Sequence, residues 1–289
     1  MICNCCPRLC GAERSETEGK GFCRMPASFV VARAALHQWE EPSISGTNGS
    51  GTIFFSGCCL SCVFCQNDEI SHQGIGKRIS PRRLGDIIQE LIAQGAHNIN
   101  LVNPTHFSMM LAEHLERYPV PVVWNSGGYE RPETLRALEG KVQIYLPDLK
   151  YLDSETALRY SGAADYPRYA IPAIEEMVRQ TGPVVMEGGL LRRGVVIRHL
   201  ILPGQTAQAK RVMDWATETF PRGTVLFSLM SQYTPLGQAG RFPELNRVLR
   251  RSEIRAAEEY MENLGLEGYV QEPSAAAGRY VPAFDLTGV

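Results

Sequence analysis

The chain has 289 residues, 44% of them apolar, and a formal net charge of −2, which suits one large α/β domain with a small appendage or two modest domains. A charge so close to zero gives no indication of nucleic acid or an anionic membrane as a partner. No apolar run reaches the ~18 residues of a membrane-spanning helix, and the N-terminus lacks the apolar core of a signal peptide. We therefore expect a cytoplasmic protein, in which nine cysteines are metal ligands more naturally than disulfides.

The first 50 residues are predicted to form an irregular, cysteine-rich appendage. Four of its cysteines, Cys3, Cys6, Cys10 and Cys23, have the spacing C-x2-C-x3-C-x12-C. Four thiolates make a closed site, which suits either a structural Zn2+ ion or an auxiliary iron–sulfur cluster that relays electrons. The segment has too few apolar residues to fold unaided, so the metal is expected to supply folding energy. Cys5 is an alternative ligand in place of Cys3 or Cys6.

From residue 51 to 272 the pattern predicts one α/β domain. Short β-rich runs alternate with helical patterns, which indicates at least six βα units and a parallel sheet. Strands are expected at 52–55, 98–102, 121–124, 142–146, 195–202, 224–229 and near 269–270, and helices at 81–94, 107–118, 131–138, 154–160, 167–180, 206–219 and about 246–263. Residues 273–289, rich in Pro, Gly and Ala, are predicted to be a surface tail.

Three cysteines follow the first of these strands. Cys58, Cys62 and Cys65 have the spacing C-x3-C-x2-C, one thiolate fewer than a closed cluster site needs. Three ligands leave one iron of a [4Fe–4S] cluster open, and an open metal position is where a substrate or cofactor can bind. Phe64 would shield such a cluster from solvent.

Other roles for this triad are a zinc site or ordinary packing. A structural zinc site needs a fourth ligand, which would have to come from Cys59, from His72 or from a distant residue. No cysteine occurs after Cys65, and cysteines that merely pack would not avoid the remainder of the chain. We therefore favour the open [4Fe–4S] cluster.

Polar residues gather where the later strands end. They are Asn103, Asn125, Asp148, Lys150 and Arg198. In a parallel αβ barrel, full or partial, the active site lies at the C-terminal ends of the strands. By spacing alone, however, Asp148 and Lys150 could equally mark an exposed strand end.

Several stretches of the chain resemble a known superfamily. They are Ser56-Gly57-Cys58 with Cys62-Val63-Phe64-Cys65-Gln66-Asn67, Asn125-Ser126-Gly127-Gly128-Tyr129-Glu130, Pro147-Asp148-Leu149-Lys150, Ile197-Arg198-His199-Leu200-Ile201-Leu202-Pro203-Gly204 and Ser228-Leu229-Met230-Ser231-Gln232-Tyr233. The chain resembles the radical S-adenosylmethionine (SAM) superfamily and, within it, the pyruvate formate-lyase activating enzyme-like branch with an N-terminal Cys-Pro-Arg-x-Cys-Gly element. The resemblance implies a partial (β/α)6-type barrel that holds a [4Fe–4S] cluster and SAM.

The resemblance also implies residue roles. Asp148 and Lys150 would lie at the active-site mouth as catalytic residues, and Arg198 would bind the carboxylate or ribose of SAM. The further SAM-binding residues would be Asn103, Thr105, Asn125 and Ser126. The Gly-Gly-Glu sequence common in the superfamily is missing, and Asn103-Pro104-Thr105-His106 stands in its place. Weaker candidates are His106, Gln232 and Tyr233, while Gln66 and Asn67 would cap the cluster loop and Cys59 replaces a residue that is usually polar.

Three functions remain open at this point. The electron from the cluster would cleave SAM to a 5′-deoxyadenosyl radical, which would take a hydrogen atom either from the glycine of a partner glycyl radical enzyme or from a small molecule, peptide or RNA. Both need a reductant such as flavodoxin or ferredoxin. The third function is a non-catalytic iron–sulfur or zinc protein for binding or electron transfer. Activases often carry extra cysteines after the triad, and this chain has none there.

Overall fold

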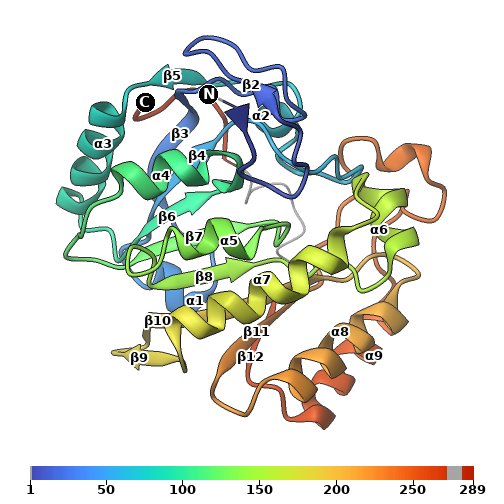
Figure 1. Ribbon diagram of the computed structural model, residues 1–289. Helices are drawn as coiled ribbons and strands as arrows, with labels where there is room; N and C mark the ends of the chain where they lie inside the picture. Colours follow the sequence, from blue (N-terminus) through green and yellow to red (C-terminus); the bar gives the residue numbers. More distant parts are fainter. Residues whose placement is uncertain (1, 272–281) are drawn as a thin grey trace.

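One large sheet organises the molecule. The computed structural model describes residues 2–271 and 282–289. Seven parallel strands neighbour one another in chain order (Figure 1): β4 (Ser50–Phe55), β6 (Ile99–Val102), β7 (Val122–Ser126), β8 (Ile144–Pro147), β10 (Leu190–Leu200), β11 (Val225–Met230) and β12 (Gly268–Gln271). The predicted α/β fold with a parallel sheet is confirmed. The path of paired strands runs from β12 to β5 and does not close within the described residues.

Helices connect these strands. They are α3 (Pro81–Ala93), α4 (Ser108–His114), α5 (Pro132–Arg136), α6 (Ser154–Ser161), α7 (Tyr166–Thr181), α8 (Thr206–Thr219) and α9 (Arg251–Leu264), with two short ones, α1 (Pro42–Ser45) and α2 (Asp68–Ser71). Local signals set their ends: Ser80 caps α3 by accepting from the backbone N–H of Arg83, and Gly162 ends α6 with a left-handed φ of 63°. None of these helices is long and apolar enough to cross a membrane.

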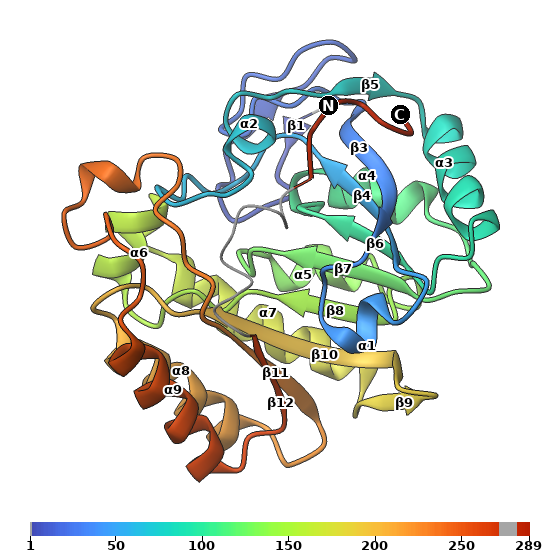
Figure 2. The ribbon, with the colours of Figure 1, turned by 180° about the vertical axis from the view of Figure 1, so that it is seen from behind.

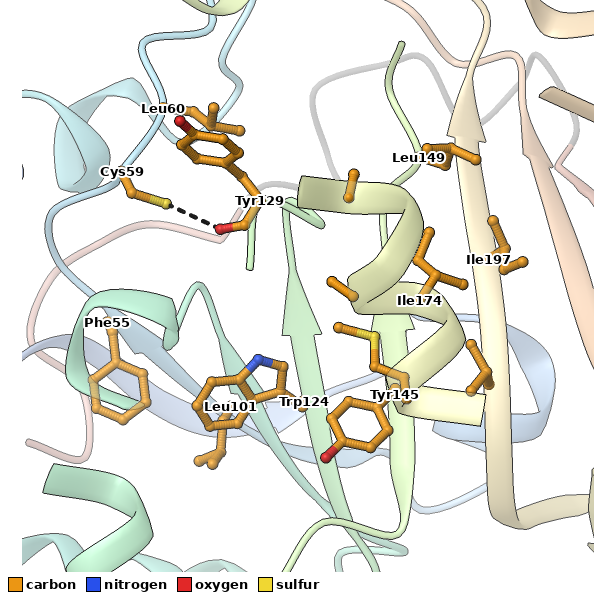
Figure 3. Packing of buried hydrophobic residues seen from close by; sticks show 14 of the residues in the cluster. Phe55, Cys59, Leu60, Leu101, Trp124, Tyr129, Tyr145, Leu149, Ile174 and Ile197 are labelled. Atoms are coloured by element: carbon orange, nitrogen blue, oxygen red, sulfur yellow. Dashed lines mark hydrogen bonds between the residues drawn. The ribbon is translucent and has the colours of Figure 1, made fainter. Parts of the chain in front are cut away.

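The two faces of the sheet carry different layers. Because side chains alternate along a strand, Trp124, Tyr145 and Ile197 belong to the outer apolar layer, which also includes Ile174 of α7 (Figure 3). On the opposite face α1 lies against the sheet (Figure 2) and Ile44 packs with apolar residues of β7, β8 and β10, namely Val123, Ile144, Leu146 and Val196. The next inward positions along β7 and β10 are Asn125 and Arg198. The inner face is therefore apolar near α1 and polar toward the C-terminal ends of the strands.

Antiparallel strands extend the sheet at one edge. β3 (Phe29–His37) pairs with β4, and β5 (Lys77–Ile79) pairs with the first residues of β3. β3 thus lies in the main sheet, although its range falls within the predicted appendage. Beyond β5, the backbone of Leu286 donates to Ala32 at 3.1 Å and Ala34 donates to Thr287 at 2.9 Å. Of the predicted tail, residues 273–281 lie outside the described residues.

Two further pairs of strands were not predicted. β9 (Val185–Glu187) forms an antiparallel hairpin with the start of β10, through Gly188 and Gly189 at φ of 57° and 80°. Two glycines with positive φ suit the tight turn of such a hairpin. Near the N-terminus, β1 (Ile2–Cys3) and β2 (Ala12–Glu13) pair only with each other.

Candidate active site

The triad loop leaves the C-terminal end of β4. Gly57 turns the chain with a φ of 82°, and a side chain there would collide with Met25. The side-chain amide of Asn103 donates to the Gly57 carbonyl, and the imidazole Nε2 of His106 lies 2.7 Å from the Ser56 carbonyl. The entry to the loop is therefore fixed by residues at the end of β6.

The three triad thiols influence one another. The hydrogen bond from Cys59 lowers the pKa of Cys58 to about 6. Burial raises the pKa of Cys62, with the charge of Cys58 adding to the rise, and burial followed by the charges of Cys62 and Cys58 raises that of Cys65 to about 12. The backbone N–H of Leu60 also donates to Cys58 Sγ at 3.4 Å. The thiols of Cys62 and Cys65 therefore lie close enough to Cys58 for its charge to act on them.

The triad consists of three thiols on one loop. Among residues 2–271 and 282–289, no three His, Cys, Asp or Glu side chains form a group that could hold a metal ion. A [4Fe–4S] cluster takes one thiolate per iron, so its ligands surround a shared space instead of meeting at a point. Three neighbouring thiols on one loop, one of them already with a low pKa, fit this donor chemistry.

An ion network lies beside the triad on the inner face. Lys150 Nζ donates to Asp148 Oδ2 at 2.7 Å, and Arg198 Nε donates to Asp148 Oδ1 at 3.0 Å. Arg198 also donates to Asn125 Oδ1 at 2.6 Å and pairs with Glu40 Oε2 at 3.4 Å. The network joins the ends of β7, β8 and β10 to the segment before α1.

Burial and charge act against each other in this network. Burial alone would raise the pKa of Asp148, but Lys150 and Arg198 hold it below its usual value. Burial would likewise lower the pKa of Lys150, and the charge of Asp148 outweighs it, so the ammonium stays protonated. This cation lies close enough to Cys58 and Cys62 to favour their thiolate forms. A small cavity here is lined by Phe64, Asp148, Lys150, Tyr151, Leu200 and Leu202.

The remaining predicted SAM-binding residues have partners within the protein. Thr105 Oγ1 donates to Glu130 Oε1 at 2.7 Å, and Ser126 Oγ accepts from the backbone of Gly128 at 3.3 Å. His106 is fully buried, and burial lowers its pKa to about 3, so it is neutral. Within this arrangement His106 supports the loop that carries the triad, whereas Thr105 binds Glu130.

Other side chains weighed from the sequence also have structural partners. His72 Nδ1 lies 2.7 Å from Asp68 Oδ1, and its Nε2 lies 3.3 Å from the Leu60 carbonyl. Tyr233 is buried and donates to the Leu245 carbonyl at 2.9 Å. The amide of Gln232 contacts that of Gln271. Asn67 is the residue before α2, so it caps that helix by position.

Sequence reasoning missed three residues of the site. Glu40 contacts Asn100, Asn125 and Arg198 from a segment that precedes the first parallel strand. Glu130 is fully buried, accepts from Trp124 Nε1 at 3.0 Å, and has its pKa raised by burial to about 7. The Tyr166 hydroxyl lies 2.6 Å from the Asp148 carbonyl and 2.9 Å from that of Gly127. Glu130 belongs to a stretch that the sequence had already singled out, whereas Glu40 gave no signal beyond its charge.

The N-terminal cysteines also come together. Cys3 is hydrogen-bonded to Cys5 and to Cys10. The bond to Cys5 is the main cause that lowers the pKa of Cys3 to about 5. Burial raises the pKa of Cys23, which senses the charges of Cys6 and Cys3 and accepts from Arg14 Nη2 at 3.2 Å. Cys10 is exposed, whereas the other four thiols are buried. Cys5 lies among the predicted ligands.

Side chains attach this element to the α/β domain through backbone carbonyls. Arg8 donates to the carbonyls of Cys59 and Gly162, each at 2.8 Å, and Arg14 donates to that of His106 at 2.7 Å. From the domain, Arg131 donates to the Asn4 carbonyl at 2.6 Å and Thr134 to that of Cys5 at 3.0 Å. The N-terminal thiols are thereby held next to the triad loop.

The uncharacterized protein MJ0674 of Methanocaldococcus jannaschii is similar along most of its length. It is 30% identical over 277 residues, which cover 92% of this chain and 75% of that protein. The chain belongs to the MJ0674 family. No family model matches it.

Solved structures are similar to this member of the MJ0674 family at the level of fold. SuiB of Streptococcus suis, bound to the precursor peptide SuiA, aligns with a TM-score of 0.51 at 12% identity, over 75% of this chain and 47% of SuiB. The chain thus spans about half the length of SuiB, and the two share a fold. A domain of pyruvate-formate lyase-activating enzyme from Bacteroides vulgatus aligns with a TM-score of 0.38 at 14% identity, over 66% of this chain and 91% of that domain. The latter score supports no conclusion about the branch.

Proposed function

We propose that this chain is a radical SAM enzyme. The observation that carries the proposal is the position of the triad: three neighbouring thiols leave the C-terminal end of β4, beside the ion network at the ends of β7, β8 and β10. Ligands of α/β folds bind at this edge of a parallel sheet. The fold shared with SuiB supports the same superfamily.

Cys58, Cys62 and Cys65 would hold a [4Fe–4S] cluster, whose open iron would take SAM. When bound, the cluster and SAM would supply a 5′-deoxyadenosyl radical for hydrogen abstraction. The protein would position SAM and exclude water. Phe64, Tyr151 and Leu202 provide apolar walls near the triad for this purpose.

Charged groups line the inner face beside the triad. Asp148 pairs with Lys150 and Arg198, and Arg198 also pairs with Glu40. Burial raises the pKa of Glu40 and Glu41, so these two carboxyl groups add less negative charge than their number suggests. Arg198 would contact the SAM carboxylate or ribose while Asp148 and Glu40 keep its guanidinium in place, and Asn125 and Ser126 would lie next to it.

Anaerobic purification followed by iron and sulfide analysis tests the cluster. We expect at least one [4Fe–4S] cluster, which Cys62→Ala abolishes. The matched control is Ser61→Ala on the same loop, because it removes no thiol and should keep the cluster. With dithionite as reductant, the wild-type protein should release methionine and 5′-deoxyadenosine from SAM. A protein that holds the cluster but never cleaves SAM would disprove the proposal.

The motif resemblance supports the glycyl radical activase as the finer proposal, with flavodoxin or ferredoxin as reductant. Co-expression with a candidate glycyl radical enzyme should then produce a glycyl radical signal by EPR that disappears with Cys62→Ala. SAM cleavage without such a signal would favour a small molecule, peptide or RNA as substrate, in line with the absence of cysteines after Cys65.

A further inference from the structure

The last turn of α6 lies against the triad loop. The backbone N–H of Ser61 donates to the Ser161 carbonyl at 3.1 Å, and that of Val63 donates to the Tyr160 carbonyl at 2.9 Å. The final carbonyls of a helix have no partner within the helix, and here the triad loop supplies two donors. The residues on both sides of Cys62 are therefore fixed to the end of α6.

Gly162 permits this close approach. It follows α6 with a φ of 63°, and a Cβ atom there would collide with Ser61 Oγ. Ser61 Oγ also donates to the Ser161 carbonyl at 3.3 Å, and the Gly162 carbonyl accepts from Arg8 at 2.8 Å. The spacing between α6 and the triad loop is therefore set by contacts that do not involve sulfur.

A chain of hydroxyl groups leads from α6 to one sulfur of the triad. Ser161 Oγ lies 3.0 Å from Cys62 Sγ and 2.8 Å from the hydroxyl oxygen of Tyr151. Ser161 and Tyr151 are both 0% exposed. Hydrogen bonds are stronger in such a buried place than in water, because the local dielectric is low.

The chemistry of a cluster ligand fixes the direction of this chain. A ligand sulfur is a thiolate, which has no proton and can only accept, whereas a hydroxyl has one proton to donate. With Cys62 as a ligand, the Ser161 hydroxyl is therefore the donor to sulfur. Its proton is then in use, so the Tyr151 hydroxyl is the donor to Ser161 Oγ.

Tyr151 is held in place by its other contacts. Its ring meets that of Tyr166 edge-on, with 5.6 Å between the ring centroids. It also lines the small cavity beside the triad, together with Phe64, Asp148 and Lys150. The chain of hydrogen bonds therefore runs from the wall of this cavity to the sulfur of Cys62.

We propose that Ser161 is a positioning residue that raises the reduction potential of the triad cluster by donating a hydrogen bond to Cys62, and that Tyr151 holds the Ser161 hydroxyl in this direction. The inference rests on the proposed function, because it takes Cys62 as a cluster ligand. A hydrogen bond to a ligand sulfur stabilises the negative charge that one added electron brings. The electron comes from an external one-electron donor, and both hydroxyl protons stay in place.

A mediated redox titration of the anaerobic holoprotein without SAM, followed by the EPR signal of the reduced cluster, tests this role. The signal that Cys62→Ala removes identifies the triad cluster. At a fixed potential, Ser161→Ala should lower the ratio of reduced to oxidised cluster by roughly tenfold, the order expected for one hydrogen bond to a charged group; for a one-electron couple this is a shift of about 59 mV. Tyr151→Phe keeps the ring and loses the hydroxyl, so it should lower the ratio by less.

Three further variants separate the hydrogen bond from packing. Ser161→Thr keeps an O–H donor and should recover most of the shift. Ser61→Ala is the matched control at the same junction, because it removes a hydroxyl that donates to a carbonyl and not to sulfur, and it should leave the ratio unchanged. The double variant of Ser161→Ala and Tyr151→Phe should match Ser161→Ala alone, because Tyr151 acts only through Ser161.

An unchanged potential in cluster-loaded Ser161→Ala would overturn the inference, as would a further shift when Tyr151→Phe is added to it. Iron and sulfide analysis accompanies each titration. If Ser161→Ala holds no cluster, Tyr151→Phe decides: a lowered ratio supports the inference, and an unchanged ratio overturns it. A potential that depends on Ser161 in a protein that never cleaves SAM would overturn the proposed function and leave the inference intact. A wild-type chain without a cluster would overturn both.

Discussion

The two cysteine groups lie side by side but are supported in different ways. The triad leaves β4, a strand of six residues that pairs with β3 and β6 inside the main sheet. Of the N-terminal thiols, only Cys3 lies on a strand: β1 and β2 have two residues each and pair only with each other. The fold can thus position the triad before any metal binds, whereas the N-terminal element depends on its thiols and on a few hydrogen bonds to the domain.

Loss of a ligand should therefore have the largest effect in the N-terminal element. Cys23→Ala should remove its metal and abolish the hydrogen-exchange protection of residues 2–25, because metal binding and folding are coupled in such small sites. Cys62→Ala is the matched control, since it should remove the triad cluster and leave that protection in place. Elemental analysis of the two variants also separates zinc from iron. Full protection in metal-free Cys23→Ala would contradict this contrast.

Loss of a charge should destabilise the α/β domain instead. Asp148→Ala leaves Lys150 and Arg198 buried without their shared carboxylate, which should lower the free energy of unfolding by about 3–5 kcal/mol. Urea denaturation measures this loss. Asp148→Asn keeps the shape and one acceptor oxygen, so its free energy of unfolding should lie between those of the wild type and Asp148→Ala. The metal content of the N-terminal element should not change. A loss of that metal would mean that the two regions fold as one unit.

Glu130 lies at the junction of the two regions, because its charge acts on Cys6 and the charge of Cys58 acts on it. Burial raises its pKa from 4.5 to about 7, so the folded protein keeps a proton that the unfolded chain loses. Stability should fall as the pH rises from about 4.5 to about 7, by about 3 kcal/mol in total. Glu130→Gln should flatten this dependence in thermal unfolding. If stability depends on pH equally in the wild type and in Glu130→Gln, a group other than Glu130 is responsible for the dependence.

Of the four changes, loss of the contact between the N-terminal element and the α/β domain should have the smallest effect on stability. Arg8→Ala removes two hydrogen bonds to carbonyls, worth about 1–2 kcal/mol together. Hydrogen exchange should quicken in residues 2–10 and stay the same in the domain. Arg8→Lys should restore only part of the protection, because an ammonium cannot reproduce the planar fork. Faster exchange across β7 and β8 would show that Arg8 stabilises more than the junction.

The regular elements were predictable because their signals are local. The helix expected at 206–219 is found at Thr206–Thr219, and Ser80 with Pro81 marks the start of α3. The helix expected at 107–118 is shorter, Ser108–His114, and follows a single 3-10 turn. β3 was not predicted as a strand, since its partners lie at 50–55 and 77–79 and pairing over such distances leaves no periodic signal in the strand itself.

The site could be predicted only in part. The ends of parallel strands meet at one edge, so Asn125, Asp148 and Arg198 could be expected to lie together, and they do. The pairing of Arg198 with Glu40 could not be predicted. Glu40 lies in a loop, and the sequence pattern of the strands does not indicate where that loop lies. The contact between Cys62 and Ser161 is likewise invisible in the sequence, since 98 intervening residues separate them. It depends on how α6 sits against the triad loop.

The way in which β3 is covered has a consequence for self-association. β5 pairs with Phe29–Val31, and the backbone of Leu286 and Thr287 then satisfies Ala32 and Ala34. An uncovered strand offers its free N–H and C=O groups to another chain and so promotes aggregation. Two segments that lie more than 200 residues apart in the sequence together close this edge. The last residues of the chain thus protect the solubility of the sheet, a role that is independent of the chemistry at its opposite rim.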